Sequence, residues 1–280
     1  MAEPATGREL HPPLLAAIPD PQRRRIEATR VAVVVAHPDD ETVGCGALLG
    51  RLTGAMLVLV TDGAPANATD AHRYGFAETA AYAATRRREL DSALAIVADG
   101  ELRLVLLGVP DQQAALRLVE ISEKLLRLFR SSGITAALTH AYEGGHPDHD
   151  ATAFAVHAAR RRLMAEGRPL TILEMPYYRL GSGGMVAQSF AGAAPPAVTL
   201  HLTAEERARK ACMLAAHATQ QAVLADFGTE TEQFRPAPDY DFTALPNDGA
   251  LFYALQDWGM TGEQWRRHAR AALAELGITP

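Results

Sequence analysis

Cysteine is scarce in this sequence: Cys45 and Cys212 are the only two among 280 residues. Two thiols are too few for a multi-disulfide scaffold or a four-thiolate zinc site, and they suit a reducing, intracellular setting. Basic charge is also in deficit, because 27 Lys and Arg residues face 33 Asp and Glu residues, for a formal net charge of −6. That balance predicts no partnership with nucleic acid or anionic lipid.

Long apolar stretches and targeting signals are missing as well. No apolar run approaches the ~20 residues of a membrane-spanning helix. Glu3 and Pro4 stand where a signal peptide needs basic residues. We therefore expect a cytoplasmic protein without a membrane span, and a homo-oligomer stays open. A composition of 48% hydrophobic and 21% charged residues is that of a globular protein with a sizeable core.

Apolar β-branched runs alternate with amphipathic segments along the first two thirds of the chain. Continuous runs such as VAVVV at 31–35 are typical of strands buried on both faces of a parallel sheet. We expect strands over 30–36, 56–61, 101–108, 134–139 and 170–176, and helices over 42–52, 78–97, 113–129 and 150–165. This alternation predicts an α/β fold, a Rossmann-like parallel sheet with helices on both faces, in which the third strand lies beside the first.

The chain is predicted to have three parts. Residues 1–29 form an N-terminal arm, residues 30–225 the main domain, and residues 226–280 a C-terminal α/β extension of that domain, because no Pro/Gly/Ser linker precedes it. In the less regular last third we expect a strand near 198–202, a helix over 203–225 with a capping box, and a final helix over 262–276. The aromatic residues at 252, 253, 258 and 265 fit core packing better than a pocket wall.

Two polar loops carry the chemistry. His37-Pro38-Asp39-Asp40-Glu41 follows the first predicted strand, and His146-Pro147-Asp148-His149-Asp150 follows the fourth. In open parallel sheets ligands bind at the carboxyl ends of strands, where both loops lie. Carboxylates packed this closely repel one another unless a cation binds them. Nitrogen and oxygen ligands without thiolates suit a catalytic zinc that keeps a position open for water.

Simpler explanations of these loops are less favoured. Acidic residues before a helix are ordinary capping chemistry, but two such loops at equivalent strand ends favour a shared metal site. A dinucleotide-binding fingerprint around Gly44 and Gly46 is disfavoured, because these glycines do not stand directly at the strand end. We expect the glycines to let a helix pack closely over the first loop, with Cys45 a small buried residue.

The segments AHPDDETVGCGALL and GGHPDHDATAFAVHAA resemble the two metal-site motifs of the LmbE-like, or PIG-L, zinc-dependent N-deacetylases. The segments RRREL at 86–90, LGVPD at 107–111 and KACMLAAHATQ at 210–220 are also similar to that family. The resemblance covers roughly residues 31–220. It implies a hydrolase that uses metal-activated water to remove an acetyl group from an N-acetylated amino sugar or N-acetylglucosamine conjugate.

The resemblance also implies a role for each matching position. His37, Asp40 and His149 would be the ligands of Zn²⁺ or of another divalent transition metal. Asp39 would be the general base for the metal-activated water. His146 would assist charge or proton transfer in the tetrahedral intermediate.

Three further positions complete the implied site. Asp148 would orient a neighbouring imidazole, and Arg86 and Asp111 would bind hydroxyl groups of a small-molecule amino-sugar conjugate. Whether Tyr142 or His217 reaches the site stays open. The alternatives are a metal-dependent hydrolase of another amide or ester, and a non-catalytic metal-binding protein on the same fold. A binder needs no base beside its metal, so the acid–base residues of the two motifs argue against the second alternative.

Overall fold

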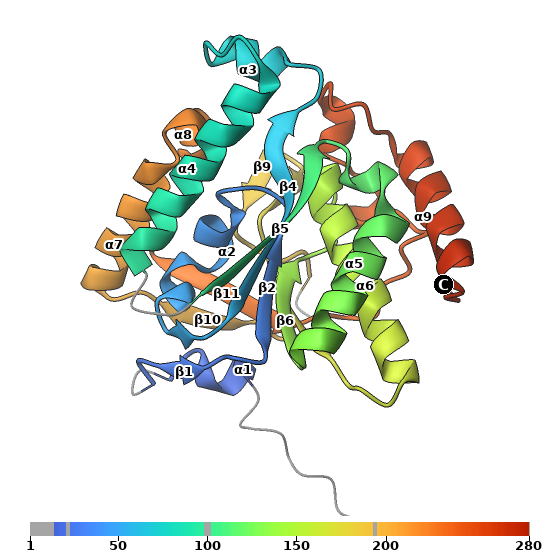
Figure 1. Cartoon of the computed structure of the whole chain (residues 1–280), viewed down its shortest axis with the longest axis horizontal. Helices are drawn as coiled ribbons and strands as arrows, with labels where there is room; N and C mark the ends of the chain where they lie inside the picture. Colours follow the sequence, from blue (N-terminus) through green and yellow to red (C-terminus); the bar gives the residue numbers. More distant parts are fainter. Residues whose placement is uncertain (1–13, 21–22, 98–101, 193–194, 280) are drawn as a thin grey trace, which may run out of the picture.

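The computed structural model describes residues 14–20, 23–97, 102–192 and 195–279 (Figure 1). Residues 1–13 and 21–22 of the predicted N-terminal arm, and residue 101 of the third predicted strand, therefore lie outside the described residues. The described part of the arm contains α1 (Leu14–Ala17) and β1 (Ile26–Glu27). Strand β1 pairs in parallel with β3 (Leu52–Thr53).

A seven-stranded sheet in the order β10-β11-β7-β6-β2-β4-β5 forms the centre of the fold. Its parallel strands are β2 (Val31–Val35), β4 (Met56–Pro65), β5 (Arg103–Asp111), β6 (Ala136–His140) and β7 (Thr171–Met175). At one edge β11 (Thr231–Pro236) and β10 (Val198–His201) pair antiparallel. The predicted α/β fold with a mostly parallel sheet is confirmed.

The predicted position of the third strand is wrong. Strand β5 pairs with β4 at the edge of the sheet, and β2 lies between β4 and β6. The register of β4 and β5 shifts along their length, and Asp111 at the end of β5 pairs with Pro65. Because both strands are long and irregular, the end of β5 still reaches the site described below.

Helices cover both faces of this sheet (Figure 1). One face carries α2 (Asp40–Leu49), α4 (Thr79–Val97) and α7 (Ala204–Ala216), and the other carries α5 (Leu118–Ser132), α6 (Pro147–Ala165) and α9 (Gly262–Leu276). The side chains of β2 alternate between two cores, with Val33 and Val35 in one and Ala32 and Val34 in the other. A strand covered on both faces needs apolar residues at every position, which explains the uninterrupted run.

The predicted helices differ from the observed ones near the loops. Helix α6 begins at Pro147, three residues before its predicted start, because His146 serves as its N-cap and proline suits the first helical position. The helix predicted over 113–129 is divided into η1 (Ala114–Leu116) and α5. The helix predicted over 203–225 has its capping box but ends at Ala216, and η2 (Ala218–Gln220) and α8 (Gln221–Leu224) follow.

A break inside α2 at Cys45, whose φ is −151°, is spanned by a buried ion pair. Lys210 Nζ donates to the Val43 carbonyl at 2.9 Å and lies 2.8 Å from Glu232 Oε1. Glu232 accepts from two backbone N–H groups in the second half of α2, at 2.7 and 3.0 Å. Both charged side chains are fully buried. The pair satisfies backbone groups that the break would otherwise leave without partners.

The residues after 225 contain β11, η3 (Asn247–Gly249), η4 (Tyr253–Leu255) and α9. Helix α9 contributes Trp265 to the core that it shares with α5 and α6. Trp265 Nε1 donates to the Tyr142 hydroxyl at 2.6 Å, and that hydroxyl donates to the Ala244 carbonyl at 2.8 Å. Tyr142 is therefore a core residue.

The division of the chain at residues 29/30 and 225/226 stays a prediction. Several elements were not foreseen from the sequence, among them α3 (Thr69–Arg73), the hairpin of β8 (Tyr178–Gly181) and β9 (Gly184–Ala187), and strand β11. Across the described ranges, no helix combines the length and apolarity required to cross a bilayer.

Candidate metal and catalytic site

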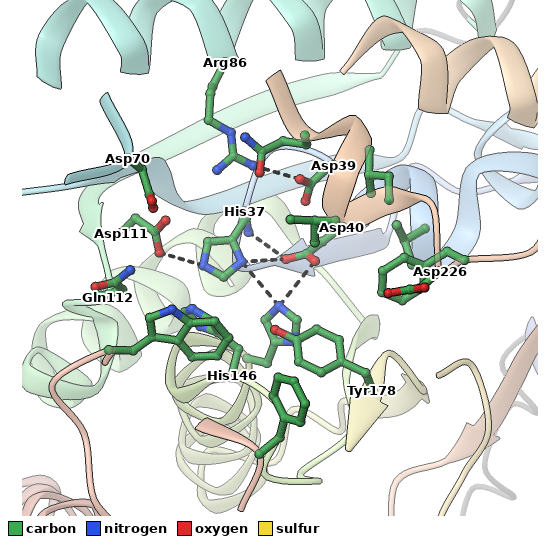
Figure 2. A pocket seen from close by; sticks show the side chains of 18 of the residues that line it. His37, Asp39, Asp40, Asp70, Arg86, Asp111, Gln112, His146, Tyr178 and Asp226 are labelled. Atoms are coloured by element: carbon green, nitrogen blue, oxygen red, sulfur yellow. Dashed lines mark hydrogen bonds and ion pairs between the residues drawn. The ribbon is translucent and has the colours of Figure 1, made fainter. Parts of the chain in front are cut away.

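The two predicted metal loops meet at the carboxyl ends of β2 and β6, which are neighbours in the sheet. Figure 2 shows His37, Asp39, Asp40 and His146 around one pocket. The first loop leads into α2 and the second into α6, so two helices begin at this rim. The fold thus brings together residues that are more than a hundred positions apart in the chain.

His37, Asp40 and His149 form a tight cluster. His37 Nδ1 lies 3.2 Å from Asp40 Oδ2, His149 Nε2 lies 3.3 Å from Asp40 Oδ1, and the two ring nitrogens lie 3.3 Å apart. Ligand atoms about 2.0–2.1 Å from a tetrahedral metal are about 3.3 Å from one another. The two ring nitrogens therefore have the separation that a tetrahedral divalent metal requires, and each faces one oxygen of Asp40 at a similar distance.

A second group of potential ligands shares His37 and adds Asp111, His146 and Asp148. In this group Asp148 already accepts backbone N–H groups of Gln112 at 2.6 Å and Ala114 at 2.9 Å. Its oxygens are thus engaged in fixing the loop after β5. In the first cluster Asp40 Oδ2 accepts the backbone N–H of His37 at 2.7 Å, but Asp40 Oδ1 faces His149 Nε2 at 3.3 Å. The first cluster fits a metal better, because one oxygen of its carboxylate faces the ring nitrogens.

The other ring nitrogen of His37 faces two carboxylates. His37 Nε2 lies 3.0 Å from Asp111 Oδ1 and 3.5 Å from Asp148 Oδ2. Burial lowers the pKa of His37, but the carboxylates of Asp111, Asp148 and Asp40 together outweigh it, and the pKa of the imidazole ends above its ordinary value. Burial likewise opposes ionisation of Asp111, yet His37 brings the pKa of that carboxyl below its ordinary value. Carboxylates beside the outer nitrogen of a metal-binding histidine fix its ring and raise its basicity.

Asp39 has an unusual backbone conformation, with φ 131° and ψ −29°. An L-residue rarely adopts this conformation, and such strain is commonly found at functional sites. The backbone N–H of Asp39 donates to Glu41 Oε2 at 2.9 Å, which helps to hold it. Burial raises the pKa of Asp39 to about 7, against the lowering effect of Arg86. A carboxylate with a pKa near the working pH is suited to general base catalysis.

Arg86 reaches this loop from α4. Its Nη2 donates to Asp39 Oδ2 at 2.8 Å and to the Pro38 carbonyl at 2.7 Å, and its Nη1 donates to the Gly63 carbonyl at 2.7 Å. Gly63 has φ +70°, and a Cβ there would lie 2.6 Å from Arg86 Nη1. Glycine is therefore required for this approach. The predicted contact of Arg86 with a substrate stays a prediction, while its contact with the predicted base is observed.

His146 presents one nitrogen to the pocket. Its Nδ1 accepts the backbone N–H of Asp148 at 3.1 Å, so the neutral ring carries its proton on Nε2. Burial and the neighbouring His37 lower the pKa of His146 below its ordinary value. The ring lies 4.5 Å from His37 and 4.5 Å from Trp258, measured between ring centroids. A neutral imidazole held in this way is a hydrogen-bond donor.

The site opens into a pocket of about 340 Å³. Arg86 and Asp111 both line it, as do Asp70, Gln112 and Gln220. The remaining lining includes the charged Arg73 and Asp226 and is otherwise apolar and aromatic: Val43, Tyr74, Tyr82, Tyr178, Met185, Val223, Leu224, Phe227, Phe252 and Trp258. The expectation that the later aromatic residues belong to the core holds for Tyr253 and Trp265, which are fully buried, and is wrong for Phe252 and Trp258.

Residues behind the first loop support it. His217, whose place was open, is fully buried and lies 3.3 Å from Glu41 Oε1. Gly44 lets Tyr177 approach α2, since a Cβ there would lie 2.4 Å from the Tyr177 hydroxyl. That hydroxyl donates to the Asp40 carbonyl at 3.0 Å. Cys45 is buried, as expected.

A family model described as PIG-L, GlcNAc-PI de-N-acetylase, matches residues 32–160. The chain contains a domain of this deacetylase family. The match includes all eight predicted site residues and both metal loops. No curated protein matches the chain.

Solved structures share the fold. The deacetylase Dbv21 of the antimicrobial A40926 pseudoaglycone is 21% identical with a TM-score of 0.55, and the match covers 76% of this chain and 98% of that one. The N,N'-diacetylchitobiose deacetylase of Pyrococcus horikoshii is 16% identical with a TM-score of 0.53, and the match covers 75% of this chain and 84% of that one. A 4-carboxy-2-hydroxymuconate hydratase from Pseudomonas putida is 14% identical with a TM-score of 0.50, and the match covers 76% of this chain and 98% of that one. The fold therefore carries more than one reaction, and the site must decide the function.

Proposed function

We propose that this protein is a zinc-dependent hydrolase that removes the acetyl group from an N-acetylated amino sugar, such as an N-acetylglucosamine conjugate. The convergence of His37 Nδ1, Asp40 and His149 Nε2 at 3.2–3.3 Å, with Asp39 in the same pocket, carries the proposal. The deacetylase family domain supports it. Zn²⁺ suits these donors with one side open, and another divalent transition metal would accept the same set.

When bound, the metal polarises the acetyl carbonyl and lowers the pKa of the attacking water. Asp39 accepts the proton of that water as the oxygen bonds to the carbonyl carbon. His146 Nε2–H donates to the carbonyl oxygen as negative charge develops there. The proton on Asp39 then passes to the amide nitrogen as the C–N bond breaks, so that acetate and a free amine result.

Three residues position these groups or the substrate. Arg86 orients Asp39 through the 2.8 Å contact and keeps its carboxylate available as a base. Asp148 and Asp111 hold the His37 ring. Arg86 and Asp111 also line the pocket, and we propose that they contact sugar hydroxyl groups there.

The experiment is a screen for acetate release by the metal-loaded protein. The substrates are N-acetylhexosamine conjugates, a simple acetamide and an acetyl ester, and Asp39→Asn is the matched control. Release from the sugar conjugates, lost in Asp39→Asn with metal retained, supports the proposal. Release from the ester or the simple amide alone would favour the alternative hydrolase, and a metal-loaded protein without any turnover would favour a binding protein.

A further inference from the structure

One wall of the pocket consists of four aromatic rings, Tyr178, Phe227, Phe252 and Trp258, which we call the aromatic wall. The rings form a continuous series. Ring centroids of Trp258 and Phe252 lie 6.3 Å apart, those of Phe252 and Tyr178 5.6 Å, and those of Tyr178 and Phe227 6.3 Å. The series begins at His146, whose ring is 4.5 Å from Trp258. The third ring of the series, Tyr178, lies 5.4 Å from His149, so the wall borders the metal cluster as well as His146.

The aromatic wall is attached to the second metal loop. The backbone N–H of Phe252 donates to the Gly144 carbonyl at 2.8 Å. A Cβ at Gly145 would lie 2.0 Å from the Tyr178 carbonyl oxygen, so Tyr178 packs directly on the loop backbone. In Figure 2 Tyr178 and His146 lie on the same side of His37, away from Arg86. The position of the wall is thus fixed relative to the catalytic groups.

The four rings are only partly buried, unlike the core residues Tyr253 and Trp265 beside them. Met185 and Val223 extend the apolar lining, and the metal cluster lines the same pocket. A cavity of about 340 Å³ is large enough for a drug-sized ligand rather than for an acetamido group alone. All four rings lie outside the family-matched residues 32–160. The family motifs therefore do not account for the wall.

We propose that the aromatic wall binds an apolar aglycone, a substituent joined to the N-acetylated sugar. This inference rests on the proposed deacetylase function and names its substrate class. The acetamide lies at the metal end with the sugar beside His146, and the apolar group packs on Phe252 and Tyr178. Partly exposed rings gain most from covering apolar ligand surface, because water leaves both surfaces.

The experiment compares two substrates of the metal-loaded protein, phenyl and methyl N-acetyl-β-D-glucosaminide. The wild type should prefer the phenyl compound in kcat/KM by about tenfold, chiefly through KM. Phe252→Ala and Trp258→Ala should abolish most of that preference, and Trp258→Phe should retain most of it. Leu255→Ala is the control, because Leu255 lies in the same segment, is 67% exposed and does not line the pocket.

Calorimetry with phenyl and methyl β-D-glucosaminide, which carry no acetyl group, measures binding without turnover. A phenyl preference in Kd that both alanine variants lose supports the aromatic wall even if no acetate is released, which would count against the proposed function alone. Acetate release without a phenyl preference would overturn the aromatic wall and leave the function intact. An unchanged preference in both folded alanine variants would also overturn it.

Discussion

Arg86 and Asp39 form a buried ion pair at 2.8 Å, although Asp39 has a φ of 131°. The same guanidinium nitrogen donates to the carbonyl of Pro38, the residue before Asp39. Arg86 therefore holds the strained residue by its carboxylate and by the preceding peptide group. Strain of this kind persists only where surrounding contacts determine it, and here one side chain supplies two of them.

This contact predicts the pH dependence of the reaction. Asp39 must be ionised to accept a proton, so kcat/KM should fall as the pH falls through the pKa of Asp39, at or below about 7 because a bound cation lowers it. Arg86→Met removes the guanidinium that lowers the pKa of Asp39, so the fall in kcat/KM should occur about one pH unit or more higher. Arg86→Lys keeps a positive charge and should shift the fall less. An unshifted pH profile of kcat/KM in a folded Arg86→Met variant would assign Arg86 a purely structural role.

A second prediction concerns the base itself. Asp39→Asn should retain the metal and lower kcat by about 10²–10⁴-fold, because general base catalysis is lost while the ligand cluster stays intact. Turnover and metal content are measured on the same preparation. Near-normal turnover would remove Asp39 from the mechanism.

Metal content discriminates between the two clusters of potential ligands. His149→Ala should lose most of the bound metal, whereas His146→Ala, in the second group only, should keep it. Elemental analysis after dialysis gives the result. The reverse pattern would place the metal between His37, Asp111, His146 and Asp148.

Asp111 has two proposed contacts, one with His37 and one with the sugar, and the variant Asp111→Ala tells their effects apart. If its contact with His37 at 3.0 Å matters most, Asp111→Ala should weaken metal affinity by about 10–100-fold. If sugar binding matters most, KM for a full conjugate should rise, with little change for a simple acetamide. Competition with a metal chelator and kinetics at saturating metal measure the two effects.

The burial of His157 predicts that the fold loses stability as the pH falls. It packs against Tyr240 and Phe242, and burial lowers its pKa to about 3. Because the unfolded state takes up a proton near pH 6.5 and the folded state does not, the stability from neutral His157 is complete above about pH 6.5 and is lost as the pH falls toward 3. The loss is at most ~1.4 kcal/mol per pH unit.

The variant His157→Phe should remove that part of the pH dependence. Urea unfolding at pH 5 and pH 7.5 measures it, with the exposed His201→Phe as the control. If the free energy of unfolding falls equally from pH 7.5 to pH 5 in wild type and in His157→Phe, other groups cause the loss of stability.

Sequence reasoning worked where the information is local. The run at 31–35 and the two loops depend on neighbouring residues, and the loops meet because β2 and β6 are adjacent. It failed where distant side chains decide the outcome. Arg86 lies 47 positions from Asp39, and no periodicity reveals that its guanidinium would point at the loop. Likewise, nothing in the spacing of Phe252 and Trp258 distinguishes a core residue from a pocket residue.

The buried pair of Lys210 and Glu232 bears on how far the chain can be shortened. Glu232 lies on β11, beyond the last residue of the predicted main domain, yet its carboxylate is paired with a lysine within that domain. A protein truncated after residue 225 would bury the Lys210 ammonium without its partner, a change that typically costs about 3–5 kcal/mol. It would also leave the far edge of β7 open, because β11 is its neighbour there. The segment after residue 225, which carries three of the four rings of the aromatic wall, therefore cannot be removed without destabilising the fold, and swapping it between relatives would require Glu232 to stay.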